Sequence, residues 1–152
     1  MAIAAGIFTE TFKDATDGTI ALDMGVETHK GALFTDTLTS DFDADTAYAV
    51  APYDANETSG GSWSAGGIAL TGTTWVDTSE VDHLTLDATD VSVGTTTLAA
   101  AMGYLLYADA LAGNDVICMA DFGTAVTTTN GTITITWTAA ASGGVMNFDM
   151  TP

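Results

Sequence analysis

The chain has 152 residues, of which 20 are acidic and only two are basic, so its formal charge at pH 7 is −18. A surface of this charge repels DNA, RNA and anionic lipid, because binding to them depends on Lys and Arg. The hydrophobic content of 47% is too high for a disordered chain. We therefore expect a folded protein whose partners are neither nucleic acids nor membranes.

The N-terminal segment, residues 1–18, is predicted to be a short helix or an extended arm in front of a single β-rich domain, residues 19–152. Its apolar side chains make it a candidate for contact with a neighbouring subunit. These interface candidates are Ile7, Phe8 and Phe12. Asp17-Gly18 is a turn signal, and the four residues after it, 19–22, are predicted to form a strand.

An acidic run follows at Asp41, Asp43 and Asp45, with the spacing that opens a calcium-binding loop. The EF-hand pattern next requires Gly at its sixth position and Glu at its twelfth, where this chain has Thr46 and Pro52. The three aspartates are therefore weak metal candidates only, and a solvated acidic loop is the alternative interpretation.

Residues 56–67 form a loop by composition, because they are rich in Gly and Ser. A flexible linker does not usually carry a Trp, so the ring of Trp63 is predicted to dock against another surface. That surface is either a neighbouring subunit, which makes Trp63 a further interface candidate, or the end of this chain's own sheets.

Short strands are predicted through the rest of the chain. Those before residue 98 are one strand over 68–76, interrupted at Gly72, and strands at 84–87 and 91–93. The alanine-rich run from Leu98 to Leu111 is compatible with a buried helix or with a strand from about residue 102 to 108. The apolar run 116–120 is predicted to be a fully buried strand.

The clearest local pattern is the alternation of residues 132–138, which places Ile133, Ile135 and Trp137 on one face of a strand. Asn130-Gly131 is the preferred pair for a type I′ hairpin turn, so this strand is predicted to pair with about 126–129. A last short strand is expected at 145–148. Many short strands separated by turns indicate a mainly β fold, an antiparallel sandwich or barrel-like domain.

Residues suited to catalysis are scarce. His29 and His83 are the only conventional bases near neutral pH, and neither lies in a triad or metal motif. No phosphate-binding glycine loop with Lys is present. Cys118 lies in an apolar run and is interpreted as a small buried hydrophobe. We therefore expect no enzyme, no catalytic residue and no cofactor.

Five segments form an ordered set that covers about the C-terminal two-thirds of the chain. The segments are Asn56-Glu-Thr-Ser-Gly-Gly-Ser-Trp-Ser-Ala-Gly-Gly-Ile-Ala-Leu-Thr-Gly72, Leu86-Asp-Ala-Thr-Asp-Val91, Gly103-Tyr-Leu-Leu-Tyr-Ala-Asp109, Val116-Ile-Cys-Met-Ala-Asp-Phe-Gly123 and Asn130-Gly-Thr-Ile-Thr-Ile-Thr-Trp137. Taken together, in order and spacing, they resemble a group of small tailed-bacteriophage virion proteins.

The resemblance implies a virion structural component, of the capsid cement or decoration type, that binds the major capsid protein on the outside of the head. The acidic surface agrees with an outside position, because it is unsuited to facing packaged DNA. The symmetry of shells favours a homotrimer. Two alternatives are a tail or tail-tip component and, from another class, an acidic calcium-binding adhesin-like β module.

Overall fold

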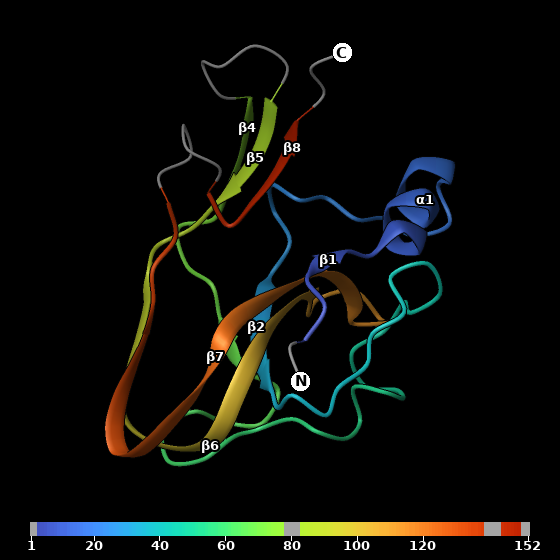
Figure 1. Cartoon of the computed structure of the whole chain (residues 1–152). Helices are drawn as coiled ribbons and strands as arrows, with labels where there is room; N and C mark the ends of the chain where they lie inside the picture. Colours follow the sequence, from blue (N-terminus) through green and yellow to red (C-terminus); the bar gives the residue numbers. More distant parts are fainter. Residues whose placement is uncertain (1–2, 78–82, 139–143, 150–152) are drawn as a thin grey trace.

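The computed structural model describes residues 3–77, 83–138 and 144–149, and the chain is mainly β with one short helix (Figure 1). The elements in chain order are β1 (Gly6–Ile7), α1 (Thr9–Asp17), β2 (His29–Phe34), β3 (Ile68–Ala69), β4 (Thr74–Asp77), β5 (His83–Asp87), β6 (Val91–Ala108), β7 (Asp115–Ile135) and β8 (Met146–Asp149). No helix in the described ranges is both long and apolar enough to cross a membrane.

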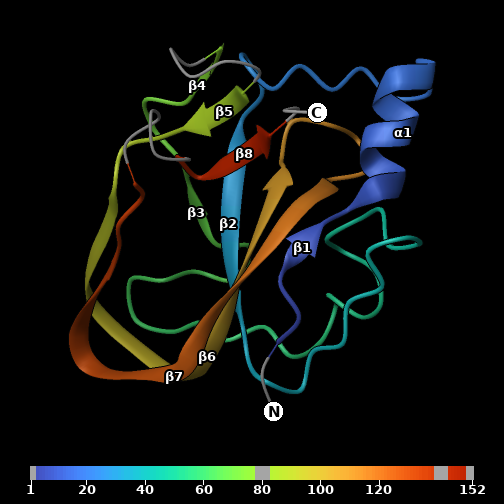
Figure 2. The same cartoon turned by 45° about the horizontal axis from the view of Figure 1, so that its top comes forward.

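The larger sheet has the strand order β1-β7-β6-β2-β3, and all of its neighbouring strands are antiparallel (Figure 2). At its centre, β2 pairs with the second half of β6, from Phe34 opposite Gly103 to His29 opposite Ala108. Every residue from 101 to 108 is buried. A strand that is covered on both faces reads as a continuous apolar run, and this resolves the predicted ambiguity at 98–111 in favour of a strand.

Two apolar clusters cover the two faces of this central region. On one face lie Leu33, Tyr104, Leu106 and Ile117 together with Leu86 and Met146 from the smaller sheet, β4-β5-β8. On the other face lie Ala32, Phe34, Leu105 and Tyr107, packed under Phe8, Leu38 and Tyr53. The alternation of neighbouring residues between the clusters follows from the period of two in a strand. The result is a sandwich-like arrangement of two sheets that does not close into a barrel.

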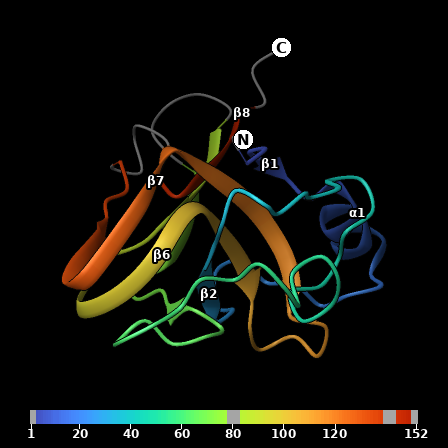
Figure 3. The same ribbon diagram turned by 60° about the horizontal axis from the view of Figure 1, so that its bottom comes forward.

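The strands β6 and β7 are much longer than the others, and their far halves extend beyond β2 as a bent two-stranded ribbon (Figures 1 and 3). The pairing register shifts at five places along them. Thr95 and Ala100 in β6, and Gly123 and Asn130 in β7, have positive φ. Bulges of this kind bend a strand and increase its twist, which explains the shape of the ribbon.

The hairpin predicted at Asn130-Gly131 is wrong. Asn130 has φ of 49° and Gly131 pairs with Thr96 of β6, so β7 continues through this site. The alternating residues after it pair with β6 instead of with 126–129, with Ile135 opposite Val91. A left-handed Asn serves a bulge as well as a turn, and only the presence of a longer partner strand decides between them.

The strand predicted at 19–22 is also wrong, because these residues follow the end of α1 in an irregular segment. The backbone N–H groups of Gly18 and Thr19 both donate to the carbonyl oxygen of Asp14, which ends the helix with a left-handed glycine. The turn signal at Asp17-Gly18 is therefore a helix end. The next strand after α1 is β2, at residues that the sequence left unassigned.

The single strand predicted over 68–76 is wrong, because the chain changes sheets near Gly72: residues 68–69 form β3 of the larger sheet and 74–77 form β4 of the smaller one. The other predicted strands are confirmed with shifted ends, and 84–87 becomes β5. Strand 116–120 lies within β7, and 145–148 corresponds to β8.

Candidate interaction surface

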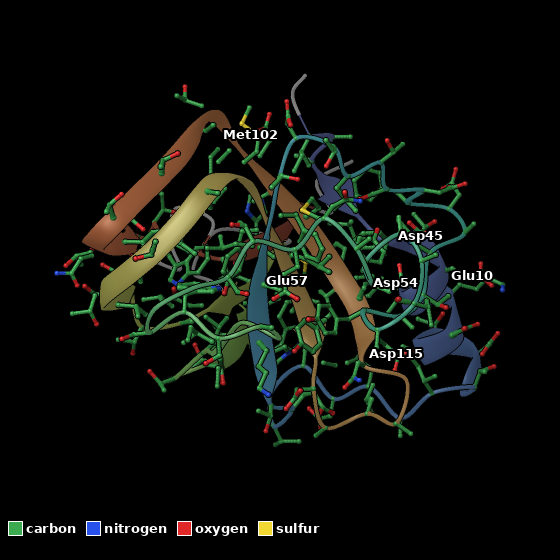
Figure 4. The ribbon with its side chains drawn as sticks, turned by 90° about the horizontal axis from the view of Figure 1, so that it is seen from below. Glu10, Asp45, Asp54, Glu57, Met102 and Asp115 are labelled. Atoms are coloured by element: carbon green, nitrogen blue, oxygen red, sulfur yellow. The ribbon has the colours of Figure 1, made fainter. Side chains whose placement is uncertain are left out.

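Charge is distributed unevenly along the chain. All 20 acidic residues, both lysines and both histidines lie outside residues 91–108 and 122–148. These uncharged stretches contain the bent ribbon. We call residues 91–102 of β6, residues 122–135 of β7 and the two residues that follow β7, 136–137, the arm, and the remaining described residues the body. Figure 4 shows the labelled acids Glu10, Asp45, Asp54 and Asp115 together on one side of the body, with Glu57 nearer the middle and Met102 near the bend of the ribbon.

One edge of the arm is covered by the body. Along β6, the backbone N–H of Thr97 donates to Gly60 O at 3.1 Å, and the N–H of Ser62 donates to Thr95 O at 3.2 Å. Thr58 adds a hydroxyl that donates to Ala99 O at 3.0 Å. The segment 58–62 thereby satisfies backbone groups of β6 that a sheet edge would leave exposed.

This covering loop is held rigidly, contrary to what its Gly and Ser content suggests. Glu57 accepts from the Tyr48 hydroxyl at 2.6 Å and from the Gly66 N–H at 2.8 Å. The pKa of Tyr48 is raised, mainly by burial and then by this bond, so Tyr48 remains a donor at neutral pH. Gly61 has φ of +64°, and an added Cβ there would lie 2.1 Å from Thr95 O. Glycine is required for the loop to approach β6 this closely.

The other edge of the arm is free. Among the described strands, only β1 lies outside β7, and it pairs only with Met119 and Cys118. Beyond these, segment 124–129 pairs with β6 on its inner side and has no described strand on its outer side, between the positive-φ residues Gly123 and Asn130. Alternate N–H and C=O groups of such a segment point away from the sheet and are available for pairing.

The arm also contains an open groove of about 460 Å³ on β7. It is formed where the two limbs of the bent strand face each other. Its lining is uncharged and consists of Ala120, Phe122, Val126 and residues 132–137. The ring of Trp137 lies at one end, 5.3 Å from the ring of Tyr104, and no described residue accepts a hydrogen bond from its buried Nε1. The groove is suited to a neutral or apolar protein segment, because it offers no charge to a ligand.

The interface residues predicted from the sequence lie in the body. Phe8 and Trp63 are completely buried in the chain's own two clusters. Ile7 and Phe12 are half-buried, and Phe12 packs edge-on against Phe148 at 4.9 Å. The ring of Trp63 thus takes the second of the two roles foreseen for it, within this chain's own sheets. A contact of the half-buried Ile7 and Phe12 with a neighbouring subunit stays a prediction, whereas Phe8 and Trp63 have no exposed surface to offer one.

The acidic run Asp41, Asp43 and Asp45 uses its carboxylates to hold its own loop. Asp45 accepts from the Tyr53 hydroxyl and from the Asp41 N–H, both at 2.8 Å. Asp41 accepts from the Asp43 N–H at 3.1 Å, and Asp43 accepts from the Thr9 hydroxyl at 3.0 Å. Within the part of the chain that the structure describes, no three acidic, His or Cys side chains are grouped so that they would hold a metal ion.

The residues considered for chemistry are dispersed. His29 is buried in β2, where both ring nitrogens have no hydrogen-bond partner among the described residues, and burial lowers its pKa. His83 begins β5 in the other sheet. Cys118 is half-buried beside the core, and burial raises the pKa of its thiol to about 12, so it stays protonated at neutral pH.

No family model, no curated protein and no solved structure matches this chain. The features of the chain that bear on its function are therefore its charge distribution, the groove and the free edge. The sequence interpretation missed this surface, although its signal is present in the sequence: two long stretches without a single charged residue, in a chain of charge −18.

Proposed function

We propose that this protein is a non-enzymatic structural component of a bacteriophage virion, a decoration protein that binds the outer surface of the head through its arm. The resemblance to small phage virion proteins supports the class. The single observation that supports the binding role is the separation of an uncharged, grooved arm from a body that carries all of the charge.

The separation suits attachment to a large protein lattice. Charged groups are costly to bury at an interface, because each loses its hydration. The arm avoids this cost, since its groove is lined by Thr hydroxyls and apolar side chains. The acidic body then faces solvent and keeps free copies apart before they bind. The proposed partner is the major capsid protein, and the groove is the proposed contact.

The test is binding to empty shells assembled from the major capsid protein of the same virus. Thr132 and Thr136 line the groove and are exposed. The double substitution Thr132→Asp with Thr136→Asp introduces charge there and should weaken shell binding by about tenfold or more, since about 1.4 kcal/mol of lost affinity is tenfold in Kd. Thr39→Asp makes the same change at an exposed position of the body and should leave shell binding unchanged.

The circular dichroism spectra of both variants should match that of the wild type, which shows that both are folded and that their binding can be compared. Equal binding of the groove variant and the Thr39 variant would reject the groove as the contact. Recovery of the protein in purified tails and not in purified heads would reject the decoration role and favour the alternative of a tail component.

A further inference from the structure

We propose that the pocket between the end of α1 and the loop that joins β6 to β7 binds one basic side chain, Lys or Arg, of a partner protein. The pocket has a volume of about 300 Å³ and is lined by residues 19–21, residues 111–113 and Asp115. It lies on the body and shares no lining residue with the groove of the arm. The inference therefore goes beyond the proposed function and does not depend on it.

The first argument is a buried carboxylate in this pocket that has no cationic partner. Asp115, labelled in Figure 4, begins β7 and exposes only 9% of its surface. Its carboxylate lies against the loop, since a Cβ added to Gly113 would be 3.0 Å from Asp115 Oδ2. Within the described ranges, only its own backbone N–H donates to this carboxylate. A buried charge without a partner destabilises a protein, and a bound cation would remove that cost.

The second argument is that the electrostatic surroundings of Asp115 favour a cation. Burial raises the pKa of Asp115 above its ordinary value, and the negative charge of Asp14 on α1 raises it further. The pocket also begins directly after α1, which ends at Asp17 and has no basic residue in its last turn. The carboxyl end of a helix carries a partial negative charge and attracts cations. A positive group in the pocket would therefore be stabilised from two sides.

The third argument identifies the cation as a side chain and not as a metal ion. Asp115 is the only charged residue of the lining, and most of the other side chains, those of Ile20, Ala21, Leu111 and Ala112, are apolar. Ca²⁺ requires about six to eight oxygen ligands, which such a lining does not offer. Lys and Arg combine an aliphatic stem with a charged head. An apolar wall that leads to one carboxylate is complementary to both parts.

The fourth argument is that the basic side chain comes from a different protein. The chain has only two basic residues, Lys13 and Lys30, and both are paired within the chain. Lys13 donates to the Glu10 carboxylate, and Lys30 Nζ lies 2.9 Å from Asp109 Oδ2. A second copy would bring the same two occupied lysines and a like charge of −18. If the proposed function holds, the capsid protein supplies the basic side chain.

The experiment is a nuclear magnetic resonance titration of the ¹⁵N-labelled chain, in about 0.15 M NaCl so that long-range attraction is screened. The probes are acetyl-Gly-Lys-Gly-amide, the matching Arg peptide, and a norleucine peptide that keeps the stem without the charge. The amide signals of residues 19–21 and 111–115 should shift and saturate with a basic peptide, and not with norleucine. Asp115→Asn should weaken this binding by about tenfold or more. Asp54→Asn removes the same charge at an exposed position of the body and should leave binding unchanged.

The stability of Asp115→Asn is a second readout. Because the substitution keeps the shape of the side chain and removes an unpaired charge, urea unfolding should show a free energy equal to or above that of the wild type. A clear loss of stability would overturn the inference, since the carboxylate would then support the loop. So would saturation by neither basic peptide, equal binding by the Asp115 and Asp54 variants, or displacement of the peptide by sub-millimolar CaCl₂, which would indicate a metal site. These probes contain no shell, so their failure leaves the shell-binding proposal standing.

Discussion

Strands β6 and β7 run through both the body and the arm of this protein, but they are covered differently in the two regions. In the body, β6 and β7 are covered on both faces, and charges surround them on loops and on α1. In the arm, the same strands alternate: Leu98, Ile133 and Ile135 are buried while the threonines between them are exposed. In this acidic protein the charge is therefore confined to the body, and the arm carries none.

The two regions are joined by a shared apolar cluster, in which Leu98, Ala101 and Ile133 of the arm pack together with body residues. The loop 58–62 along β6 and the buried ring of Trp63 add to this junction. Changes there should therefore have the largest effects.

Trp63→Ala should separate the arm from its support and lower the free energy of unfolding by about 3–5 kcal/mol, as for other buried aromatic truncations. The indole is completely buried in the cluster that includes Leu98 and Ala101 of the arm. Urea unfolding followed by fluorescence or circular dichroism measures the loss. Ser64→Ala, at the exposed neighbouring residue, is the control and should change little. A loss below about 1 kcal/mol would contradict the assignment of Trp63 to the core.

Two glycines with similar backbone angles compare the regions directly. Gly67 in the body has φ of +74°, and an added Cβ would lie 1.9 Å from Gly31 O. Gly123 in the arm has φ of +70°, with nothing within 4 Å of an added Cβ. Gly123→Ala should lower the free energy of unfolding by about 1–2 kcal/mol, which is the cost of placing Ala in a left-handed backbone conformation. Gly67→Ala should lower the free energy of unfolding clearly more, because the loop must also move away from Gly31 to make room for the added Cβ. Equal losses in urea unfolding would show that close packing does not distinguish the two sites.

Salt should stabilise the folded protein, because it screens the repulsion between the acidic side chains of the body. Raising NaCl from about 0.01 M to about 1 M shortens the Debye length from about 30 Å to about 3 Å. A close pair of like charges in water costs up to about 1 kcal/mol, so the free energy of unfolding should rise by an amount on the order of 1 kcal/mol. The Thr132→Asp, Thr136→Asp variant adds charge to the arm and should gain more from salt than the wild type. A stability that is independent of salt would contradict self-repulsion in the folded state.

The smallest expected effect is the pH response of His29. Burial lowers its pKa, so below the unfolded pKa of about 6.5 the unfolded chain binds a proton that the folded chain does not. The stabilising contribution of neutral His29 is therefore complete above this pH and is lost as pH falls. Urea unfolding between about pH 5 and pH 8 should show a weaker pH dependence for His29→Gln than for the wild type. If the free energy of unfolding of both proteins depended on pH in the same way, a group other than His29 would be responsible for the pH dependence.

The dominant secondary structure of this chain follows from its composition and local patterns. The alternation of residues 132–138 predicted which side chains are buried, and Ile133 and Ile135 are. The apolar run 116–120 and strand 84–87 were found for the same reason. These predictions succeed because a strand's two faces are encoded by the identity of neighbouring residues.

Partner strands were predicted less well. Asn130 and Gly18 each satisfy a local rule for chain reversal, but one is a bulge inside β7 and the other ends α1. Strand β2 was missed because Gly31 interrupts its pattern. That glycine is needed because an added Cβ would lie 1.7 Å from the hydroxyl of Tyr104 on β6, a requirement set by another strand.

The sequence by itself determined the β class, the acidic surface and the two uncharged stretches, since these depend only on which residues are present and in what order. Tertiary structure alone decided that the stretches lie side by side in one arm, that one edge of the arm is covered, and that the other is free. Strand pairing joins residues far apart in the chain through backbone groups that every residue carries, so the side-chain sequence specifies it only through the packing of the whole.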